Sequence, residues 1–70
     1  MASTVNFWLN GQKYYVKKKI TLLDIVNYFN YQQSLLVLEH NNLICNRNSW
    51  EKIRVSDFDQ IEIVTIVGGG

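Results

Sequence analysis

The stretch that decides the fold of this chain is Ile61-Glu62-Ile63-Val64-Thr65-Ile66-Val67-Gly68-Gly69-Gly70. β-Branched side chains are stiff at χ1 and fit a pleated surface, so residues 61–67 are predicted to form a well-buried strand. Glycine has the most backbone entropy to lose, so residues 68–70 are predicted to form a flexible tail. Such a tail reaches about 10 Å beyond the sheet, at roughly 3.3–3.6 Å per extended residue.

Two interpretations of the tail remain open at this point. A frayed terminus is the ordinary one, because chain ends are commonly disordered. A functional tail is favoured by the glycines abutting the strand directly, with no serine-containing linker between them. It would present a single group to a partner, the α-carboxyl of Gly70. The expected organisation is a folded domain over residues 1–67 and a tail over residues 68–70.

Length and charge narrow the class of protein. Seventy residues with 47% hydrophobic composition suffice for one domain around one small core. Cys45 is the single cysteine, so no intramolecular disulfide can form, and a reducing compartment is expected. A net charge of +1 gives no strong field for nucleic acid or an anionic membrane. No apolar stretch approaches the length of a membrane span, so we expect a soluble protein. We also expect it to be a monomer when free.

The beginning of the chain predicts a β-hairpin over residues 4–18. Asn10-Gly11 separates two alternating runs, and Asn-Gly favours the type I′ turn, which needs positive φ at both central residues. A two-residue loop then sets the register. One face of the hairpin is predicted to be core and comprises Val5, Phe7, Leu9, Tyr14 and Val16. The other face carries Trp8, expected to be exposed.

A helix is predicted from Leu22 to about Asn30. Thr21 and Asp24 have the spacing of a capping box. One apolar stripe at helical spacing follows and should face the core: Leu22, Ile25, Val26 and Phe29. The preceding lysines, residues 17–19, are interpreted as solvated edge-strand gatekeepers, since no phosphate-binding loop accompanies them.

A second hairpin is predicted from a strand at residues 35–38, a turn at residues 39–42 and a return strand at residues 43–45. Cys45 is interpreted as a small core residue and His40 as a solvated turn residue. Residues 46–56 are expected to be irregular, with Trp50 covering one edge of the core.

These elements predict an α+β fold, a β-grasp in which a mixed sheet holds one helix and residues 61–67 run parallel to residues 5–9. Alternation then directs Ile61, Ile63 and Thr65 toward the helix. It directs Val64 and Ile66 outward beside Trp8. An outward apolar patch of Trp8, Val64 and Ile66 is the predicted partner-docking site, with scattered surface hydrophobes as the alternative.

The sequence resembles the ThiS family of ubiquitin-like sulfur carriers over essentially its whole length. The shared motifs are Leu9-Asn10-Gly11, Thr21-Leu22-Leu23-Asp24, Val37-Leu38-Glu39-His40-Asn41, Arg47 with Trp50, Asp57-Phe58-Asp59-Gln60-Ile61-Glu62-Ile63-Val64, and Val67-Gly68-Gly69-Gly70. The sequence departs from the family at Phe58, where glycine is usual, and at Asn46, where proline is frequent. These departures put only local turn geometry in doubt.

The resemblance implies that Gly70 is adenylated and then carries sulfur as a C-terminal thiocarboxylate. It implies a ThiF-like adenylating enzyme that uses ATP and magnesium, a sulfur donor of the cysteine desulfurase type, and a ThiG-like thiazole synthase. Gly68 and Gly69 would thread into the active sites of these partners. The carrier itself would hold no cofactor and no catalytic residue. Frequent Asn, Ile, Lys and Tyr hint at an AT-rich genome, so bacterial cytoplasm or plastid stroma is expected.

Three other functions remain open from the sequence. A molybdopterin synthase small subunit would share the fold and the thiocarboxylate and differ in the sulfur acceptor. A ubiquitin-like modifier would join Gly70 to substrate lysines. A free-standing enzyme has the least support, because one histidine, one cysteine and scattered carboxylates form no recognisable triad or metal site.

Overall fold

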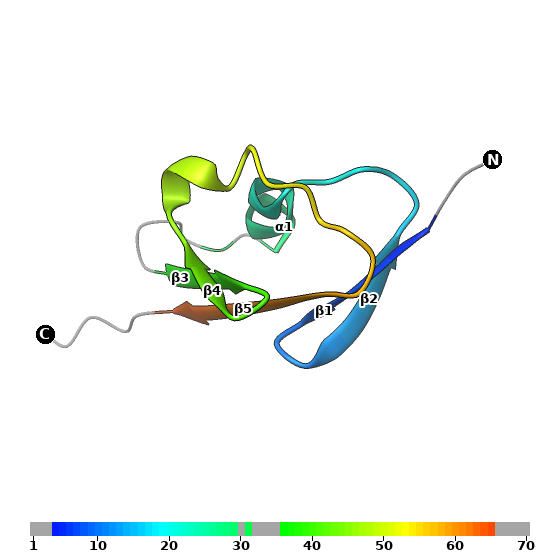
Figure 1. Ribbon diagram of the computed structural model, residues 1–70, viewed down its shortest axis with the longest axis horizontal. Coiled ribbons are helices and arrows are strands. Elements are labelled where there is room, and N and C mark those ends of the chain that lie inside the picture. The colour runs from blue at the N-terminus through cyan, green and yellow to red at the C-terminus, as the bar shows by residue number, and fades with distance from the viewer. Residues whose placement is uncertain (1–3, 30, 32–35, 66–70) are drawn as a thin grey trace, which may run out of the picture.

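The computed structural model describes residues 4–29, 31 and 36–65. Its elements in chain order are β1 (Val5–Leu9), β2 (Gln12–Val16), α1 (Leu22–Tyr28), β3 (Leu36–His40), β4 (Leu43–Cys45), the 3₁₀ helix η2 (Arg47–Ser49) and β5 (Asp59–Thr65). The strands form one mixed sheet in the order β2-β1-β5-β3-β4, with α1 on one side of it (Figure 1). The predicted α+β, β-grasp architecture is confirmed.

Strand β5 is the centre of the sheet. It runs parallel to β1, from Phe7 opposite Asp59 to Leu9 opposite Ile61, and antiparallel to β3. The strand begins earlier than predicted, at Asp59, because Asp59 and Gln60 already pair with β1. Residues 66 and 67, predicted to end this strand, lie outside the described residues.

The first hairpin has the predicted register, from Val5 opposite Val16 to Leu9 opposite Gln12. Asn10 and Gly11 take φ values of +51° and +80°, as a type I′ turn requires. The Asn10 side chain also extends the contact between β1 and β5. Its Oδ1 accepts from the Ile63 N–H at 2.7 Å, and its Nδ2 donates to the Ile63 carbonyl at 3.3 Å.

Helix α1 begins with the predicted capping box. The Thr21 hydroxyl accepts from the Asp24 N–H, and the Asp24 carboxylate accepts from the Thr21 N–H. The helix ends at Tyr28 with Phe29 as its C-cap, while Asn30 lies outside the described residues. Phe29 is half-buried, not enclosed as predicted, because this last position of the stripe lies at the helix end.

The second hairpin is tighter than predicted. Asn41 and Asn42 have φ values of +53° and +71°, so a two-residue turn suffices, and Glu39 and His40 remain in β3. Asparagine tolerates this left-handed region better than most residues. Strand β3 begins at Leu36, and Leu35 lies outside the described residues.

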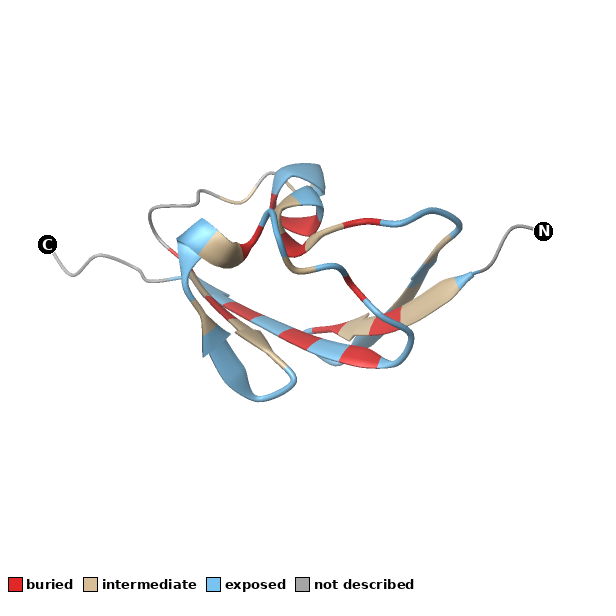
Figure 2. Ribbon diagram, turned by 45° about the horizontal axis from the view of Figure 1, so that its top comes forward, coloured by how far each residue is buried: buried red, intermediate tan, exposed pale blue. Residues whose placement is uncertain are grey.

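The core lies between α1 and the sheet, and the buried residues alternate along β5 (Figure 2). Its members are Phe7, Leu9, Ile20, Leu22, Ile25, Val26, Leu36, Leu38, Trp50, Val55, Ile61 and Ile63. Trp50 closes one edge of this core, as predicted, and is only 2% exposed.

Thr65 shares the helix-side face of Ile61 and Ile63 by alternation, as predicted, but it is exposed there. The pairing of β1 with β5 ends at Ile61, and the Asn10 side chain reaches only as far as Ile63. Thr65 therefore lies beyond the part of β5 that β1 flanks.

Candidate functional site

The predicted site residues divide into two groups. Trp8 and Val64 are described by the structure, whereas Ile66 and residues 68–70 lie outside the described residues. The part of the predicted site that the structure describes is therefore the sheet that precedes the tail.

Trp8 and Val64 are not neighbours, which corrects the prediction that they form one patch. Both lie on the sheet face away from α1, but Trp8 is opposite Gln60, and Val64 follows Gln60 by four residues on β5. That spacing corresponds to about 13 Å along a strand. The sequence pattern correctly placed Trp8 and Val64 on the same face of the sheet but missed the distance between them. Alternation within a strand determines the face, whereas the register between strands determines which residues are neighbours.

Trp8 is half-buried, not freely exposed as predicted. The Phe58 ring lies 6.4 Å from the Trp8 ring between centroids, and the Lys13 Nζ lies 5.8 Å from the Trp8 ring centroid. Aromatic packing and a cation over the ring thus cover much of this side chain.

Val64 belongs to a different apolar group on the same face, here named the outer-face patch: Val37, Ile44 and Val64. Val37 lies directly opposite Val64, and Ile44 lies opposite Glu39, which shares the face of Val37 by alternation. Ile44 is 70% exposed and Val64 is 58% exposed. These β-branched side chains, of which Val37 is half-buried, come from three adjacent strands and form a surface suited to a protein partner.

Two carboxylates adjoin the outer-face patch. Glu39 and Glu62 lie directly opposite each other on β3 and β5. Like charges at such a cross-strand position destabilise a sheet. A basic group on a partner would relieve this repulsion, so the patch has the chemistry of an apolar contact with an acidic border.

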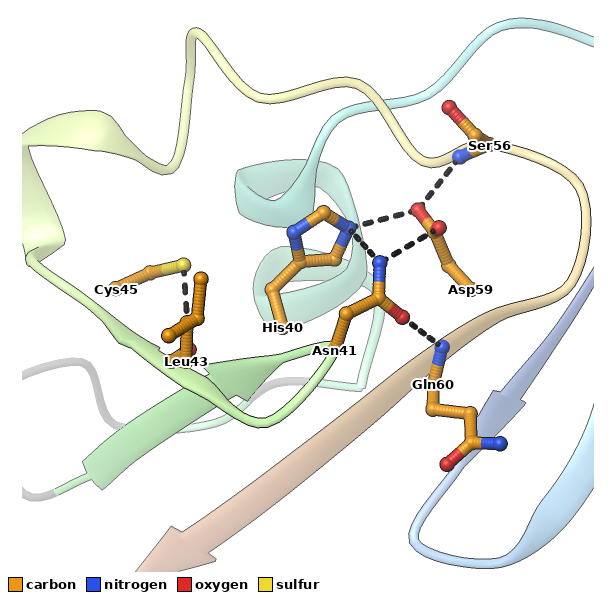
Figure 3. A network of polar contacts seen from close by, with 7 residues as sticks. All are labelled: His40, Asn41, Leu43, Cys45, Ser56, Asp59 and Gln60. Atoms are coloured by element: carbon orange, nitrogen blue, oxygen red, sulfur yellow. Dashed lines mark hydrogen bonds and ion pairs between the residues drawn. The ribbon is translucent and has the colours of Figure 1, made fainter.

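A second cluster ties the β3–β4 turn to the beginning of β5, and its centre is the buried carboxylate of Asp59 (Figure 3). Asp59 Oδ2 accepts from the Ser56 N–H at 2.7 Å and contacts His40 Nε2 at 2.7 Å. Asp59 Oδ1 accepts from Asn41 Nδ2 at 3.0 Å. Asn41 Oδ1 in turn accepts from the Gln60 N–H at 2.9 Å.

Two opposing effects set the pKa of Asp59. Burial alone raises it, but hydrogen bonds from the Ser56 N–H, His40 and Asn41, together with the electrostatic effect of the His40 ring, outweigh burial and hold the pKa below its ordinary value. The carboxylate is therefore the stable form in the fold. The cluster positions the turn and the start of the central strand.

His40 thus has a structural role that the sequence interpretation missed. It was expected to be solvated, yet it bonds a carboxylate nineteen residues away in the sequence. Cys45 is half-buried and packs against the core, as expected, with its Sγ 3.7 Å from the Leu43 carbonyl oxygen. Only the motifs around residues 39–41 and 57–64 could have pointed to the cluster, because pairing across two strands has no local signal.

Replacing Asp59 with asparagine is expected to lower the free energy of unfolding at pH 7 by about 1–3 kcal/mol, because the groups that donate to the buried carboxylate lose a charged acceptor. The folded-state pKa is depressed, so the contribution is present above the unfolded value of 3.8 and is lost as pH falls through the folded pKa. The difference between the variant and the wild type should therefore shrink in acid. Urea unfolding at pH 7 and at pH 3 measures it.

The matched control for this prediction is Glu51→Gln, the same chemical change at an exposed carboxylate. It should leave the urea midpoint nearly unchanged at both pH values. An Asp59→Asn midpoint that equals the wild type at pH 7 would contradict the stabilising role of the cluster.

Phe58, between Asp57 and Asp59, has φ of +69°. Glycine adopts this conformation without strain, which explains physically why glycine is usual here in the resembling family. The Phe58 N–H donates to the Asn6 carbonyl, and the Asp57 carboxylate accepts from the Asn6 N–H at 2.7 Å. The departure is accommodated, and the chain still enters β5 beside β1.

Among the described residues, no group of three or more His, Cys, Asp and Glu side chains is arranged to hold a metal ion. No helix in the described part of the chain has the length and apolarity to cross a bilayer. Within these residues the distinctive surface is the sheet face around β5.

Comparison with known proteins agrees with this geometry. The sequence model of the ThiS family matches residues 7–70. The chain belongs to the ThiS family. It is 32% identical over 63 residues to the sulfur carrier protein ThiS of Bacillus subtilis, covering 89% of this chain and 96% of that protein. The family assignment suggested by the sequence motifs is confirmed, and it makes the chain a ThiS-family sulfur carrier.

Other relatives extend the comparison. An uncharacterized protein, ycf40, of Trieres chinensis is 56% identical over 70 residues, covering 100% of this chain and 96% of that protein. The ycf40 protein of Pyropia yezoensis is 28% identical and covers 97% of this chain and 96% of its own. The crystal structure of the thiamine biosynthesis protein ThiS from Geobacter metallireducens superposes with a TM-score of 0.80 at 22% identity, covering 94% of this chain and all of that one. This last likeness shows the fold.

Proposed function

We propose that this chain carries sulfur as a thiocarboxylate on Gly70 and donates it for thiazole formation in thiamin biosynthesis. The observation that carries the proposal is the ThiS-family match, which extends through residue 70 and so includes the terminal glycines. The Bacillus relative is a sulfur carrier protein by name, and the Geobacter relative is named a thiamine biosynthesis protein.

The chemistry of a terminal carboxylate explains why partners are needed. An α-carboxyl has an ordinary pKa of about 3.3–3.7, so at pH 7 it is ionised and resists nucleophiles. A ThiF-like enzyme would first let the Gly70 carboxylate attack the α-phosphorus of ATP, with magnesium present, releasing pyrophosphate. The outer sulfur of a persulfide from a cysteine desulfurase would then displace AMP and form an acyl disulfide. A second thiol would reduce its S–S bond, which leaves the thiocarboxylate on Gly70 and a disulfide on the donor. A ThiG-like synthase would receive the sulfur.

The partner enzymes supply the catalytic groups in this proposal, and the chain supplies the tail and a docking face. Gly68 and Gly69 have no side chains and fit a narrow channel leading to an active site. The outer-face patch includes Val64, near the end of the central strand that precedes this tail, which makes it the preferred docking face for the adenylating enzyme. Ile66, predicted to belong to the docking face, remains a proposal, and Trp8 lies farther from the tail along the sheet.

Replacing Val64 with aspartate is expected to weaken binding to the adenylating enzyme by about 2 kcal/mol, roughly thirtyfold, because docking would bury an unpaired carboxylate. The fold should lose about 0.5 kcal/mol or less, since Val64 is 58% exposed. Isothermal titration with the adenylating enzyme measures the affinity.

Leu43→Asp is the control, because Leu43 is 71% exposed and lies outside the outer-face patch. It should bind the adenylating enzyme normally. Normal binding by Val64→Asp would remove the outer-face patch from the docking site, and equal weakening by both variants would indicate a general charge effect.

We further propose that the protein works in a plastid. The relatives named ycf40 are encoded by plastid genes, and one of them is 56% identical to this chain.

The proposed activity itself is tested by ATP–pyrophosphate exchange with the adenylating enzyme of the same cells. Exchange should require this chain, and exchange at the same rate without it would contradict the proposal.

A further inference from the structure

A second surface lies on the other side of the molecule, between β2 and α1. A groove of about 600 Å³ opens there, here named the β2–α1 groove. Its apolar lining includes Tyr14 and Val16 of β2 and Ile25 and Phe29 of the helix region. Tyr14 contacts Phe29 edge to face, with ring centroids 5.5 Å apart. The floor is therefore aromatic, packed and continuous with the core.

One wall of this groove is an unpaired strand edge. Strand β2 is the first strand in the sheet order, so only β1 pairs with it among the described strands. Leu9 and Gln12 close a two-residue turn and form a hydrogen-bonded pair, and such pairs alternate along an antiparallel ladder. Lys13 and Tyr15 consequently direct their backbone N–H and C=O groups outward. The edge offers two donors and two acceptors to an added strand.

The charges at the groove select the occupant. Lys18 and Lys19 line it, and Lys17 precedes them in the chain, whereas the Lys13 side chain lies over Trp8 on the opposite face. The Asp24 carboxylate also lines the groove and accepts from the Thr21 N–H at 2.8 Å, so the two lysines outnumber one carboxylate and leave the lining net positive. A second copy pairing through β2 would bring two sets of lysines together, and edge lysines oppose that kind of association. Charge complementarity instead favours an acidic partner.

We propose that the β2–α1 groove binds an extended, acidic protein segment that adds as a strand to the outer edge of β2. Alternate apolar side chains of this segment lie over Tyr14 and Val16, and its acidic residues lie beside Lys18 and Lys19. Strand addition combines main-chain hydrogen bonds with pockets for alternate side chains. This mode uses the free edge, the apolar floor and the lysines together.

The site is independent of the proposed sulfur-carrier function. The β2–α1 groove lies on the helix side of the sheet at the β2 edge, whereas the outer-face patch lies on the opposite face over β3, β4 and β5. A partner in the groove therefore leaves the outer-face patch free. A failure of either proposal leaves the other intact.

The experiment uses the full chain and a fluorescein-labelled peptide, Glu-Asp-Val-Ile-Val-Ile-Asp-Glu. Binding is measured by fluorescence anisotropy and its location by amide shifts in NMR spectra. We expect saturable binding, with the largest shifts at Lys13 and Tyr15 and little change at Val64. Methylating the backbone nitrogens on the peptide edge that faces β2 should abolish binding, because it removes the donors for strand addition.

Charge reversal on the protein supplies the second arm. Lys18→Glu combined with Lys19→Glu should weaken peptide binding about tenfold or more, since two charge pairs become repulsive. Arg47→Glu combined with Lys52→Glu makes the same change in net charge on exposed residues elsewhere and should not weaken it. If the first double variant does not fold, the corresponding alanine variant replaces it and should still weaken binding.

Several results would overturn the proposal. Shifts centred on Val64, or equal weakening by both double variants, would remove the binding from the groove. Undiminished binding of the methylated peptide would exclude strand addition. Tighter binding of a single-stranded oligonucleotide than of the peptide at Lys18 and Lys19 would assign these lysines to phosphate. Dimers that form through β2 as protein concentration rises would make a second copy the occupant.

Discussion

A variant lacking Gly70 is expected to bind the adenylating enzyme normally and to lose ATP–pyrophosphate exchange by on the order of 10²-fold or more. Binding should persist because deletion leaves the outer-face patch on β5 and its neighbours untouched. Exchange should fail because the new terminal carboxylate is retracted by about 3.5 Å, the length of one extended residue. A misplacement of this size prevents in-line attack on ATP.

The control for the deletion is a chain that keeps Gly70 and carries the change Gly69→Ala. This change keeps the carboxylate at its full reach and adds a single methyl group to the tail. If Gly69→Ala retains part of the ATP–pyrophosphate exchange and the Gly70 deletion does not, the shorter reach of the tail explains the lost exchange. Normal exchange by the deletion variant would show that Gly70 is not the reacting residue.

Replacing Trp50 with alanine is expected to cost about 3–5 kcal/mol of folding free energy, the largest loss of any single substitution considered. Trp50 is 2% exposed, and its Nε1 donates to the Cys45 carbonyl at 3.1 Å. Its own carbonyl accepts from the Leu23 N–H near the start of α1. Small domains have about 5–15 kcal/mol in total, so the variant should be partly unfolded at room temperature. Urea unfolding followed by circular dichroism measures the loss.

Trp50→Phe separates packing from the hydrogen bond. It keeps most of the apolar volume and leaves the Cys45 carbonyl without the indole N–H, so a loss of about 1–3 kcal/mol is expected. If Trp50→Ala lost less than about 1 kcal/mol, Trp50 would not be the closing residue of the core.

Local patterns predicted most of the fold. Asn10-Gly11 gave the first hairpin and its register, because positive φ at both positions leaves few other turns. Thr21 and Asp24 gave the beginning of α1, because a capping box acts within one turn. The β-branched run of β5 gave the central strand. Each of these signals is contained within a few neighbouring residues.

The candidate surfaces could be predicted only in part. Alternation placed Val64 and Trp8 on the outward face correctly, yet their separation depends on the register of β1 against β5, which neither strand encodes alone. The partners Val37 and Ile44 come from β3 and β4, so the outer-face patch appears only once the strand order is known. The tight second turn was missed because Asn41 and Asn42 adopt positive φ without glycine.

The Asp59 cluster and the β2–α1 groove show the same limit. His40 and Asp59 meet across two strands, and the Lys18 and Lys19 side chains line a groove whose other wall is α1. From the sequence, His40 was interpreted as a solvated turn residue and the lysines at residues 17–19 as edge-strand gatekeepers. Tertiary contacts give these side chains their further roles.

The most direct test of sulfur transfer through Gly70 is the intact mass of the full chain isolated from cells that express its partner enzymes. We expect a population heavier by the replacement of one oxygen with sulfur, located on Gly70 by fragmentation and absent when the adenylating enzyme is deleted. A chain that remains entirely unmodified under these conditions, or that is found joined through Gly70 to lysines of other proteins, would contradict sulfur transfer through Gly70.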